Sequence, residues 1–352
     1  MRLVPCAAIA FALGCSPVAT NVSPPHDAAA PDAGDARDAG PTCTLGGKST
    51  LAPATIACGQ GATGRVVLDG DDVYWAVQAP GAVVMHAPQV GGAATAVTTA
   101  KSPAVGLVVV KPWAYFTLFA SGQVARAPLA GGRVEVVADG LDRPAFLATD
   151  GASLYVTAGH DHAGAVLQIP LSAPKPVVLI DGLSRPRGVA ISGGFVYWTD
   201  FLDGTLMRAP AHLDASVADG GVRTAARLAA GLSGPSDLAL ADGHAYLADQ
   251  RGMIVRVPLA GGDPQIVAAA HGTPYGVATD ASFVYWTTLL DGGVFRAPLA
   301  GGDVTTLAIG QSDAHFLAVG ADTVFWAAWG DGGAIRRVSK LARVVVDAGA
   351  SD

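Results

Sequence analysis

The feature that most constrains the fold of this chain is a short apolar and aromatic segment that recurs at intervals of about 40 residues. The seven copies are centred on Tyr74, Tyr115, Tyr155, Tyr197, Tyr246, Tyr285 and Phe325. The interval after Tyr197 is longer than the others, and an insertion around residues 211–221 accounts for the extra length. A fixed period of this size indicates a repeat architecture, in which each unit buries its apolar face against its neighbours.

Proline and glycine divide each repeat into short segments. A proline follows each of the first six aromatics at a nearly constant distance, and Pro128, Pro258 and Pro298 continue as Pro-Leu-Ala-Gly-Gly. Proline cannot donate a hydrogen bond within a sheet and Gly-Gly favours tight turns, so we expect a strand to end at the proline and a hairpin to follow it. Other prolines, such as Pro186 and Pro274, precede the aromatic and open a strand of small residues.

Each unit is therefore predicted to contain four strands. They are an inner strand of small residues, a strand with the aromatic, a strand that ends in Arg-x-Pro, and an outer strand such as residues 305–308. Small residues near an axis and aromatics farther out suit a wedge-shaped blade, so the sequence predicts an all-β fold, a seven-bladed β-propeller with four-stranded blades. The arginines that recur in the third strand are expected to belong to this framework; they are Arg126, Arg208, Arg256, Arg296 and Arg336.

Two of the repeats resemble the YWTD repeat of low-density-lipoprotein-receptor-like propellers. The matching residues are Tyr197-Trp198-Thr199-Asp200 in full and Tyr285-Trp286-Thr287 in part. The repeats are also similar to those of NHL-like and streptogramin-lyase-like propellers, and the resemblance covers residues 64–346. It implies a propeller fold and, for Asp200, a hydrogen-bonding role between neighbouring blades. YWTD propellers usually have six blades, whereas seven units are present here, and propellers support many unrelated activities.

Composition excludes several classes of partner and cofactor. The formal net charge is -7, and no basic stripe is present to neutralise a phosphate backbone, so no nucleic-acid partner is expected. Residues 59–64 match the pattern G-x-G-x-x-G, but the residues that follow, 65–68, predict a strand instead of the helix that a pyrophosphate site requires. We therefore expect no cofactor.

The N-terminal segment predicts export. Residues 1–15 contain Arg2, an apolar run and Gly14-Cys15, which is typical of a signal peptide. The sequence Ala12-Leu13-Gly14-Cys15 resembles a bacterial lipobox, which implies that Cys15 is lipidated and becomes the mature N-terminus. An ordinary secretory signal cleaved near Ala19 is the alternative. Ser16 resembles an outer-membrane sorting signal, so we expect an outer-membrane lipoprotein in the periplasm or on the cell surface.

The remaining chain is divided by composition. Residues 16–42 are rich in Ala, Asp, Pro and Gly and predict a disordered tether, residues 43–347 form the propeller, and residues 348–352 form a disordered tail. In an oxidising compartment, Cys43 and Cys58 are expected to form a disulfide. We expect residues 342–346 to complete blade seven, although residues 46–52 resemble an outer strand and compete for the same edge. The bridge between Cys43 and Cys58 would then hold the N-terminal segment against the ring.

Candidate functional residues gather in loops that should share one face. Loops that enter the inner strands and loops that follow the aromatic strands are expected at the same end of a propeller, where ligands commonly bind. The candidate binding residues are Arg143, Arg185, Arg187, Asp237, Arg251, His271, Tyr275, His315 and Trp329. His160 and His162 flank Asp161 and could hold zinc or copper, although such loop residues are also commonly solvated.

These observations predict a lipid-anchored, monomeric binding or scaffold module without catalytic activity. Its partner would be a protein, a peptide or a glycan, and it would meet the membrane only through the lipid. The alternative is a metal-dependent hydrolase or lyase in the central funnel, which His160, His162, His271 and His315 motivate. Propeller enzymes of those kinds use Glu and Asn, whereas Glu135 is the single Glu of this chain and Asn21 its single Asn.

Overall fold

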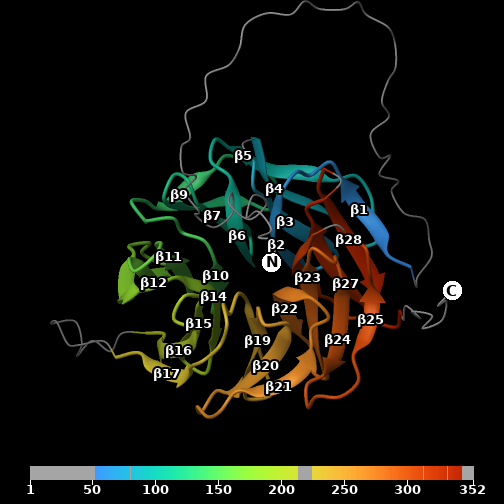
Figure 1. Cartoon of the computed structure of the whole chain (residues 1–352). Helices are drawn as coiled ribbons and strands as arrows, with labels where there is room; N and C mark the ends of the chain where they lie inside the picture. Colours follow the sequence, from blue (N-terminus) through green and yellow to red (C-terminus); the bar gives the residue numbers. More distant parts are fainter. Residues whose placement is uncertain (1–51, 80, 213–223, 312, 331, 343–352) are drawn as a thin grey trace, which may run out of the picture. The chain divides into compact units, whose positions relative to one another are not determined.

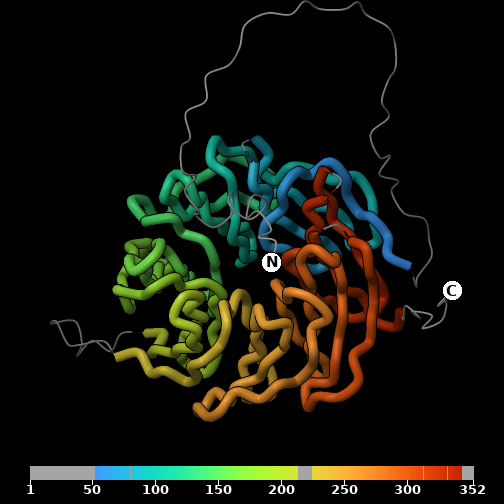
Figure 2. Tube along the Cα trace, viewed as in Figure 1, coloured from blue at the N-terminus to red at the C-terminus, as the bar shows by residue number. Residues whose placement is uncertain are grey.

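The computed structural model describes residues 52–79, 81–212, 224–311, 313–330 and 332–342. In these residues, strands β1 to β28 form seven antiparallel sheets of four strands, and the sheets are arranged as blades around one axis (Figures 1 and 2). The predicted all-β propeller with seven four-stranded blades is confirmed. No helix long and apolar enough to cross a membrane occurs in the described part of the chain.

The strands follow the chain blade by blade. Blade 1 contains β2 (Thr63–Asp69), β3 (Asp72–Val77), β4 (Gly81–Pro88) and β5 (Thr95–Ala100). Blade 2 contains β6 (Ala104–Val110), β7 (Trp113–Leu118), β8 (Gln123–Pro128) and β9 (Glu135–Ala138). Blade 3 contains β10 (Leu147–Thr149), β11 (Ser153–Ala158), β12 (Gly164–Pro170) and β13 (Val177–Leu183). Blade 4 contains β14 (Pro186–Ser192), β15 (Phe195–Asp200), β16 (Thr205–Pro210) and β17 (Ala226–Ala229).

The last three blades keep the same order. Blade 5 contains β18 (Leu238–Ala241), β19 (His244–Asp249), β20 (Met253–Pro258) and β21 (Gln265–Ala269). Blade 6 contains β22 (Thr273–Thr279), β23 (Phe283–Leu289), β24 (Val294–Pro298) and β25 (Thr305–Ala308). Blade 7 contains β26 (Ala314–Val319), β27 (Thr323–Ala328), β28 (Ala334–Ser339) and, as its outer strand, β1 (Ala54–Cys58).

The hydrophobic core lies between neighbouring blades. The aromatic strands carry four tryptophans that are fully buried, Trp75, Trp198, Trp286 and Trp326. One buried cluster joins Tyr74 of blade 1 to Phe116 of blade 2, and others join the following pairs of blades in the same way. Each blade therefore buries its aromatic strand only when a neighbour is present, as the repeat pattern predicts.

Inner strands of adjacent blades approach closely around the axis. A Cβ at Gly106 would lie 2.3 Å from the backbone oxygen of Ala145 in the next blade, so only glycine fits there. The Thr117 hydroxyl accepts a hydrogen bond from the Gly106 amide and donates one to the Ala145 carbonyl, both at 2.8 Å. Thr157 makes the equivalent bond to the carbonyl of Arg187. The threonine of the aromatic strand thus links each such blade to the next.

The ring closes differently from the prediction. Strand β1 pairs with β28, from Ala54 opposite Arg337 to Cys58 opposite Ala334, and so completes blade 7 from the N-terminal side. The expectation that residues 342–346 supply this strand was wrong, because β1 already occupies the outer edge of β28. The N-terminal candidate for this edge was residues 46–52, whereas the strand that occupies it, β1, begins at Ala54. Residues 46–51, 343–346 and Cys43 lie outside the described residues, and the disulfide stays a prediction.

The recurring arginines act as framework, as expected. The Arg208 guanidinium donates to the carbonyl of Leu259 in the next blade at 2.6 Å, and Arg256 donates to the carbonyl of Leu299 at 3.1 Å. Arg126 and Arg296 lie over Trp113 and Phe283, at 4.1 and 4.4 Å from the ring centroids. These side chains connect blades or cover aromatic rings, so they are unavailable as a repeated ligand-binding set.

Candidate functional site

One face of the ring collects the residues with functional chemistry. Because consecutive strands of a blade are antiparallel, every inner strand begins on this face and every aromatic strand ends on it. We call it the loop face. Arg187, Tyr275 and His315 lie near the starts of β14, β22 and β26, so these predicted residues stand around the loop-face end of the axis.

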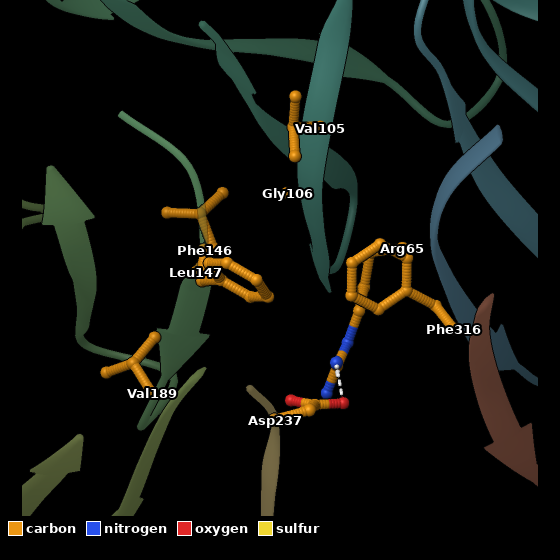
Figure 3. A pocket seen from close by; sticks show the side chains of 8 residues that line it. All are labelled: Arg65, Val105, Gly106, Phe146, Leu147, Val189, Asp237 and Phe316. Carbon is orange, nitrogen blue, oxygen red and sulfur yellow. Dashed lines mark hydrogen bonds and ion pairs between the residues drawn. The ribbon is translucent and has the colours of Figure 1, made fainter. Parts of the chain in front are cut away.

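An ion pair crosses the axis just below these residues. Arg65 of β2 donates from Nη1 to Oδ2 of Asp237, which directly precedes β18, at 2.7 Å (Figure 3). The two residues come from blades 1 and 5, which are not neighbours, so the contact runs through the centre of the ring. The Asp237 side chain is almost completely buried, whereas that of Arg65 is 25% exposed. Asp237 also accepts hydrogen bonds from the amides of Leu238 and Val277.

Aromatic rings fill the axis beside this pair. Phe316 packs edge-on against Phe146 and Tyr275, with centroids 5.8 and 5.3 Å apart, and Figure 3 shows Phe146 and Phe316 on opposite sides of the same cavity. The guanidinium of Arg65 lies 5.6 Å from the Phe316 centroid. The remaining cavity is about 10 Å³, which is room for about one water molecule. A group larger than a water molecule therefore does not fit into this cavity.

His315 is held in its neutral form at this mouth. Its ring stacks on Trp329 at 3.6 Å between centroids, meets Tyr275 edge-on at 4.9 Å, and places Nδ1 2.8 Å from the carbonyl oxygen of Asp313. Burial lowers the pKa of His315 to about 4, because a charged imidazole would lose its water. Burial also raises the pKa of Tyr275. Both side chains are uncharged near neutral pH.

Arg187 is the most unusual charged residue of the site. It is 4% exposed, and its guanidinium carbon lies 3.7 Å from the ring centroid of Phe201, the residue after β15. Its Nε is fully buried without a partner, and no hydrogen bond or ion pair joins its guanidinium to any described residue. Burial lowers the pKa of Arg187 to about 10, so it remains charged at neutral pH.

The histidine-rich loop does not bring its ligand-type groups together. His160 contacts Asp142 at 2.6 Å, Asp161 pairs with Arg185, and the ring of His162 lies 3.3 Å from the hydroxyl of Ser184. Within the described residues, no group of three or more His, Cys, Asp or Glu side chains is arranged to hold a metal ion. The proposed metal role of His160 and His162 stays a prediction.

Two aspartates at the ends of aromatic strands fix the loops of this face. The Asp200 carboxylate accepts hydrogen bonds from the amides of Ser184 and Arg185, in the segment that joins blade 3 to blade 4. This is the hydrogen-bonding role that the YWTD resemblance implies. Burial raises the pKa of Asp200. Burial acts in the same direction on Asp249, but the Arg251 guanidinium and the hydrogen bonds from the Ser233 and Arg251 amides together outweigh burial and lower the pKa of Asp249.

Other candidate residues lie farther from the axis. Arg251 and Arg143 are exposed, and Arg143 has a positive φ of 45°. His271 is exposed and stacks on Phe295, with centroids 5.5 Å apart. The structure thus gathers five of the nine predicted binding residues near the axis: Arg187, Asp237, Tyr275, His315 and Trp329. It pairs Arg185 with Asp161 and leaves Arg143, Arg251 and His271 exposed on the rim.

Sequence reasoning missed four residues of this site: Arg65, Phe146, Phe316 and Phe201. A signal for three of them was available. The inner strands can be aligned by their register with the aromatic strands. Arg65, Phe146 and Phe316 then occupy one equivalent position, and three other blades have a glycine there: Gly106, Gly188 and Gly276. A large side chain where other repeats have glycine marks a residue directed at the axis. The position of Phe201 could not be found in this way.

Comparison with known proteins supports the fold. No family model matches the chain, and no curated protein matches its sequence. The chain is similar in structure to a streptogramin B lyase, with a TM-score of 0.67, 12% identity, and coverage of 82% of this chain and 97% of that chain. It is similar to an inactive variant of virginiamycin B lyase from Staphylococcus aureus with quinupristin, with a TM-score of 0.65, 10% identity, and coverage of 82% and 98%.

A third similar structure comes from the nidogen/laminin complex, with a TM-score of 0.50, 20% identity, and coverage of 66% of this chain and 92% of that chain. The resemblance to YWTD-type propeller repeats is thereby confirmed at the level of fold. All three structures are less than 25% identical to the chain, so they support its propeller fold and leave its activity open. The number of blades, seven, comes from the sheet topology.

Proposed function

We propose that this protein is a binding module that presents its loop face to a protein or peptide partner. The observation that carries the proposal is that the loop-face end of the axis does not repeat the same residue from blade to blade. Arg187, Tyr275 and His315 come from three different blades and lie above an axis that side chains fill. A rigid ring that holds dissimilar side chains at the meeting point of its loops is suited to recognition. The nidogen structure, solved with laminin, is a precedent for a propeller in a protein complex.

The experiment that tests binding is site-specific photo-crosslinking in cells that produce the full chain. A photoreactive residue replaces Arg143 or Arg251, which are exposed on the loop face, or Ala321, which is exposed between β26 and β27 at the opposite face. We expect a discrete adduct, identified by mass spectrometry, from the loop-face positions and none from position 321. Equal adducts from both faces, or none from the loop face, would contradict the proposal.

The proposed setting is the cell envelope. The lipobox-like end of the signal supports lipidation at Cys15, and export to the periplasm or cell surface would let Cys43 and Cys58 form a disulfide. We propose a monomer that meets the membrane only through its lipid. Cys15→Ala should release the protein from the membrane fraction, and unchanged recovery in that fraction would refute lipidation.

A second candidate function is metal-dependent hydrolysis or lyase chemistry in the funnel. The similarity to two lyase structures and the presence of His315 at the mouth favour it. His160, His162 and His271 would have to move toward the axis to join a common site, because each now has a separate partner. Metal analysis of the purified chain discriminates the two functions: a stoichiometric metal lost in His315→Gln would favour the enzyme.

A further inference from the structure

The arginines of the loop face differ in how their charge is balanced. Arg65 pairs with Asp237 at 2.7 Å, Arg185 pairs with Asp161, and Arg251 pairs with Asp249 at 2.8 Å. Arg187 is more deeply buried than any of these, yet no described residue supplies it with a carboxylate or a hydrogen bond. A buried charge without a partner costs free energy, and it requires an explanation in the structure.

The aromatic contact of Arg187 balances only part of this cost. Phe201 covers one side of the guanidinium at 3.7 Å, which fixes its plane and supplies a cation–π attraction. A stack of this kind leaves the in-plane N–H groups unused. Of the guanidinium nitrogens of Arg187, none has a hydrogen-bond partner among the described residues, and only Nε is also fully buried. The two terminal nitrogens therefore keep some contact with solvent.

The guanidinium stands over the axis of the ring. Arg187 belongs to blade 4 and Tyr275 to blade 6, and blade 5 separates them along the ring. Tyr275 nevertheless lies in one buried cluster with Val189, which is on the same strand as Arg187, so the beginnings of β14 and β22 approach each other across the centre. Arg187 also has the same register in its strand as Val105, which lines the axial cavity.

We propose that Arg187 binds a carboxylate group of the peptide or protein ligand at the loop-face mouth of the axis. This inference rests on the proposed binding function and adds the chemistry of the group recognised. A planar guanidinium with unused in-plane N–H groups matches a carboxylate in a bidentate geometry. The ring of Phe201 covers one side of the guanidinium, and the burial of the side chain keeps water from most of the rest, which strengthens the pairing.

A singly charged group suits this site better than a phosphate. Among Arg65, Arg185 and Arg187, only Arg187 is available, since the other two are already paired with aspartates. Those aspartates, and the net charge of -7, would repel a second negative charge. The axial cavity below has room for about one water molecule, so only the terminal group of a ligand can enter while the rest stays on the loop face.

The test is a titration of the full chain followed by the NMR signals of arginine Nε–Hε groups at constant ionic strength. The Arg187 signal is assigned by its loss in Arg187→Lys. Acetate is expected to shift this signal saturably, acetamide is expected to leave it unchanged, and a capped tripeptide with a central glutamate should bind more tightly than its glutamine counterpart. A tripeptide with only a free C-terminal carboxylate shows whether a side chain or a chain end is preferred.

Two variants provide the matched controls. Arg187→Lys keeps the positive charge but loses the planar fork, so acetate should bind it about tenfold more weakly, as followed in parent and variant by the backbone amide signals that acetate shifts in the parent. Arg185→Met removes an equal charge two residues from Arg187. Because Asp161 already neutralises Arg185, the affinity of this variant for acetate should stay within about threefold of the parent. Circular dichroism melts establish that both variants fold, and Arg187→Gln replaces Arg187→Lys in the binding assay if that variant does not.

Several outcomes would overturn the proposal. They are a shift that is linear in salt, equal binding of acetate and acetamide, undiminished binding in the Arg187 variants, or a preference for inorganic phosphate over acetate. If these occur while the loop-face crosslink persists, the carboxylate site is wrong and the binding function stands. If the crosslink is absent but acetate binds Arg187, the anion site stands and the partner proposal fails.

Discussion

The body of the blades and the axis of the ring are built from different kinds of sequence. In the body, the same residue type returns at the same register, as in Trp75, Trp198, Trp286 and Trp326. At the axis, one equivalent position of the seven inner strands varies among the blades. From blade 1 to blade 7 it holds Arg65, Gly106, Phe146, Gly188, Asp237, Gly276 and Phe316. The repeats define the fold, and the differences among them supply the chemistry on which recognition can act.

The largest effect is expected in the body. Trp198→Ala should lower the free energy of unfolding by about 3–5 kcal/mol, because it removes a fully buried indole between blades 3 and 4 and leaves a cavity. Denaturant unfolding of the full chain measures this. Trp113→Ala is the matched control, since Trp113 is only half-buried under Arg126. A cost for Trp113→Ala as large as that for Trp198→Ala would break the comparison.

The next effect tests whether β1 belongs to the body. Ile56 is 1% exposed and packs in one cluster with Trp75 and Ile335, which joins blades 1 and 7. Ile56→Ala should therefore cost about 2–4 kcal/mol, as for a core residue. Ile266→Ala, on the outer strand of blade 5 where Ile266 is 66% exposed, should change stability by less than about 0.5 kcal/mol. If another segment closed blade 7, Ile56→Ala and Ile266→Ala would lower the free energy of unfolding by similar, small amounts.

The axial ion pair should respond asymmetrically. Arg65→Met leaves the buried carboxylate of Asp237 without its cation and should cost about 2–3 kcal/mol. Asp237→Asn should cost only about 1 kcal/mol, because the Arg65 side chain is 25% exposed and keeps contact with water, and the Asn oxygen can still accept from an amide. Unfolding of both variants and of the double variant gives the coupling. Equal costs without coupling would show that the pair is incidental.

The smallest effect is the pH response of His315. Its folded-state pKa of about 4 lies below the value of 6.5 for an ordinary histidine, so the unfolded chain takes up the proton first as the pH falls. Above about pH 7 the residue should have no effect on the pH dependence, and between about pH 6.5 and 5.5 it should remove about 1 kcal/mol of stability. His315→Gln should reduce the slope of unfolding free energy against pH in that window. An unchanged slope would mean that His315 is solvated.

The blades could be predicted almost completely from the sequence. Strand β25 has the predicted bounds Thr305–Ala308, and β4, β8, β12, β16, β20 and β24 all end at the prolines that mark the repeat. Both follow from local rules, because proline lacks a donor and Gly-Gly closes a hairpin. The choice of loop-face residues was also partly right, since strand alternation alone places Arg187, Tyr275 and His315 at one end.

Ring closure and the interior of the axis were decided by tertiary structure. The sequence offered residues 46–52 and 342–346 for the outer edge of β28. No local rule selects β1 instead, because the choice depends on where the ring brings the chain ends. Likewise, Arg65 meets Asp237 across 172 positions of sequence because seven blades place blades 1 and 5 across the axis. Sequence by itself determined the repeated unit, whose contacts are local or between neighbours. Which dissimilar residues face one another depends on the number of blades and their closure, and only the closed ring fixes both.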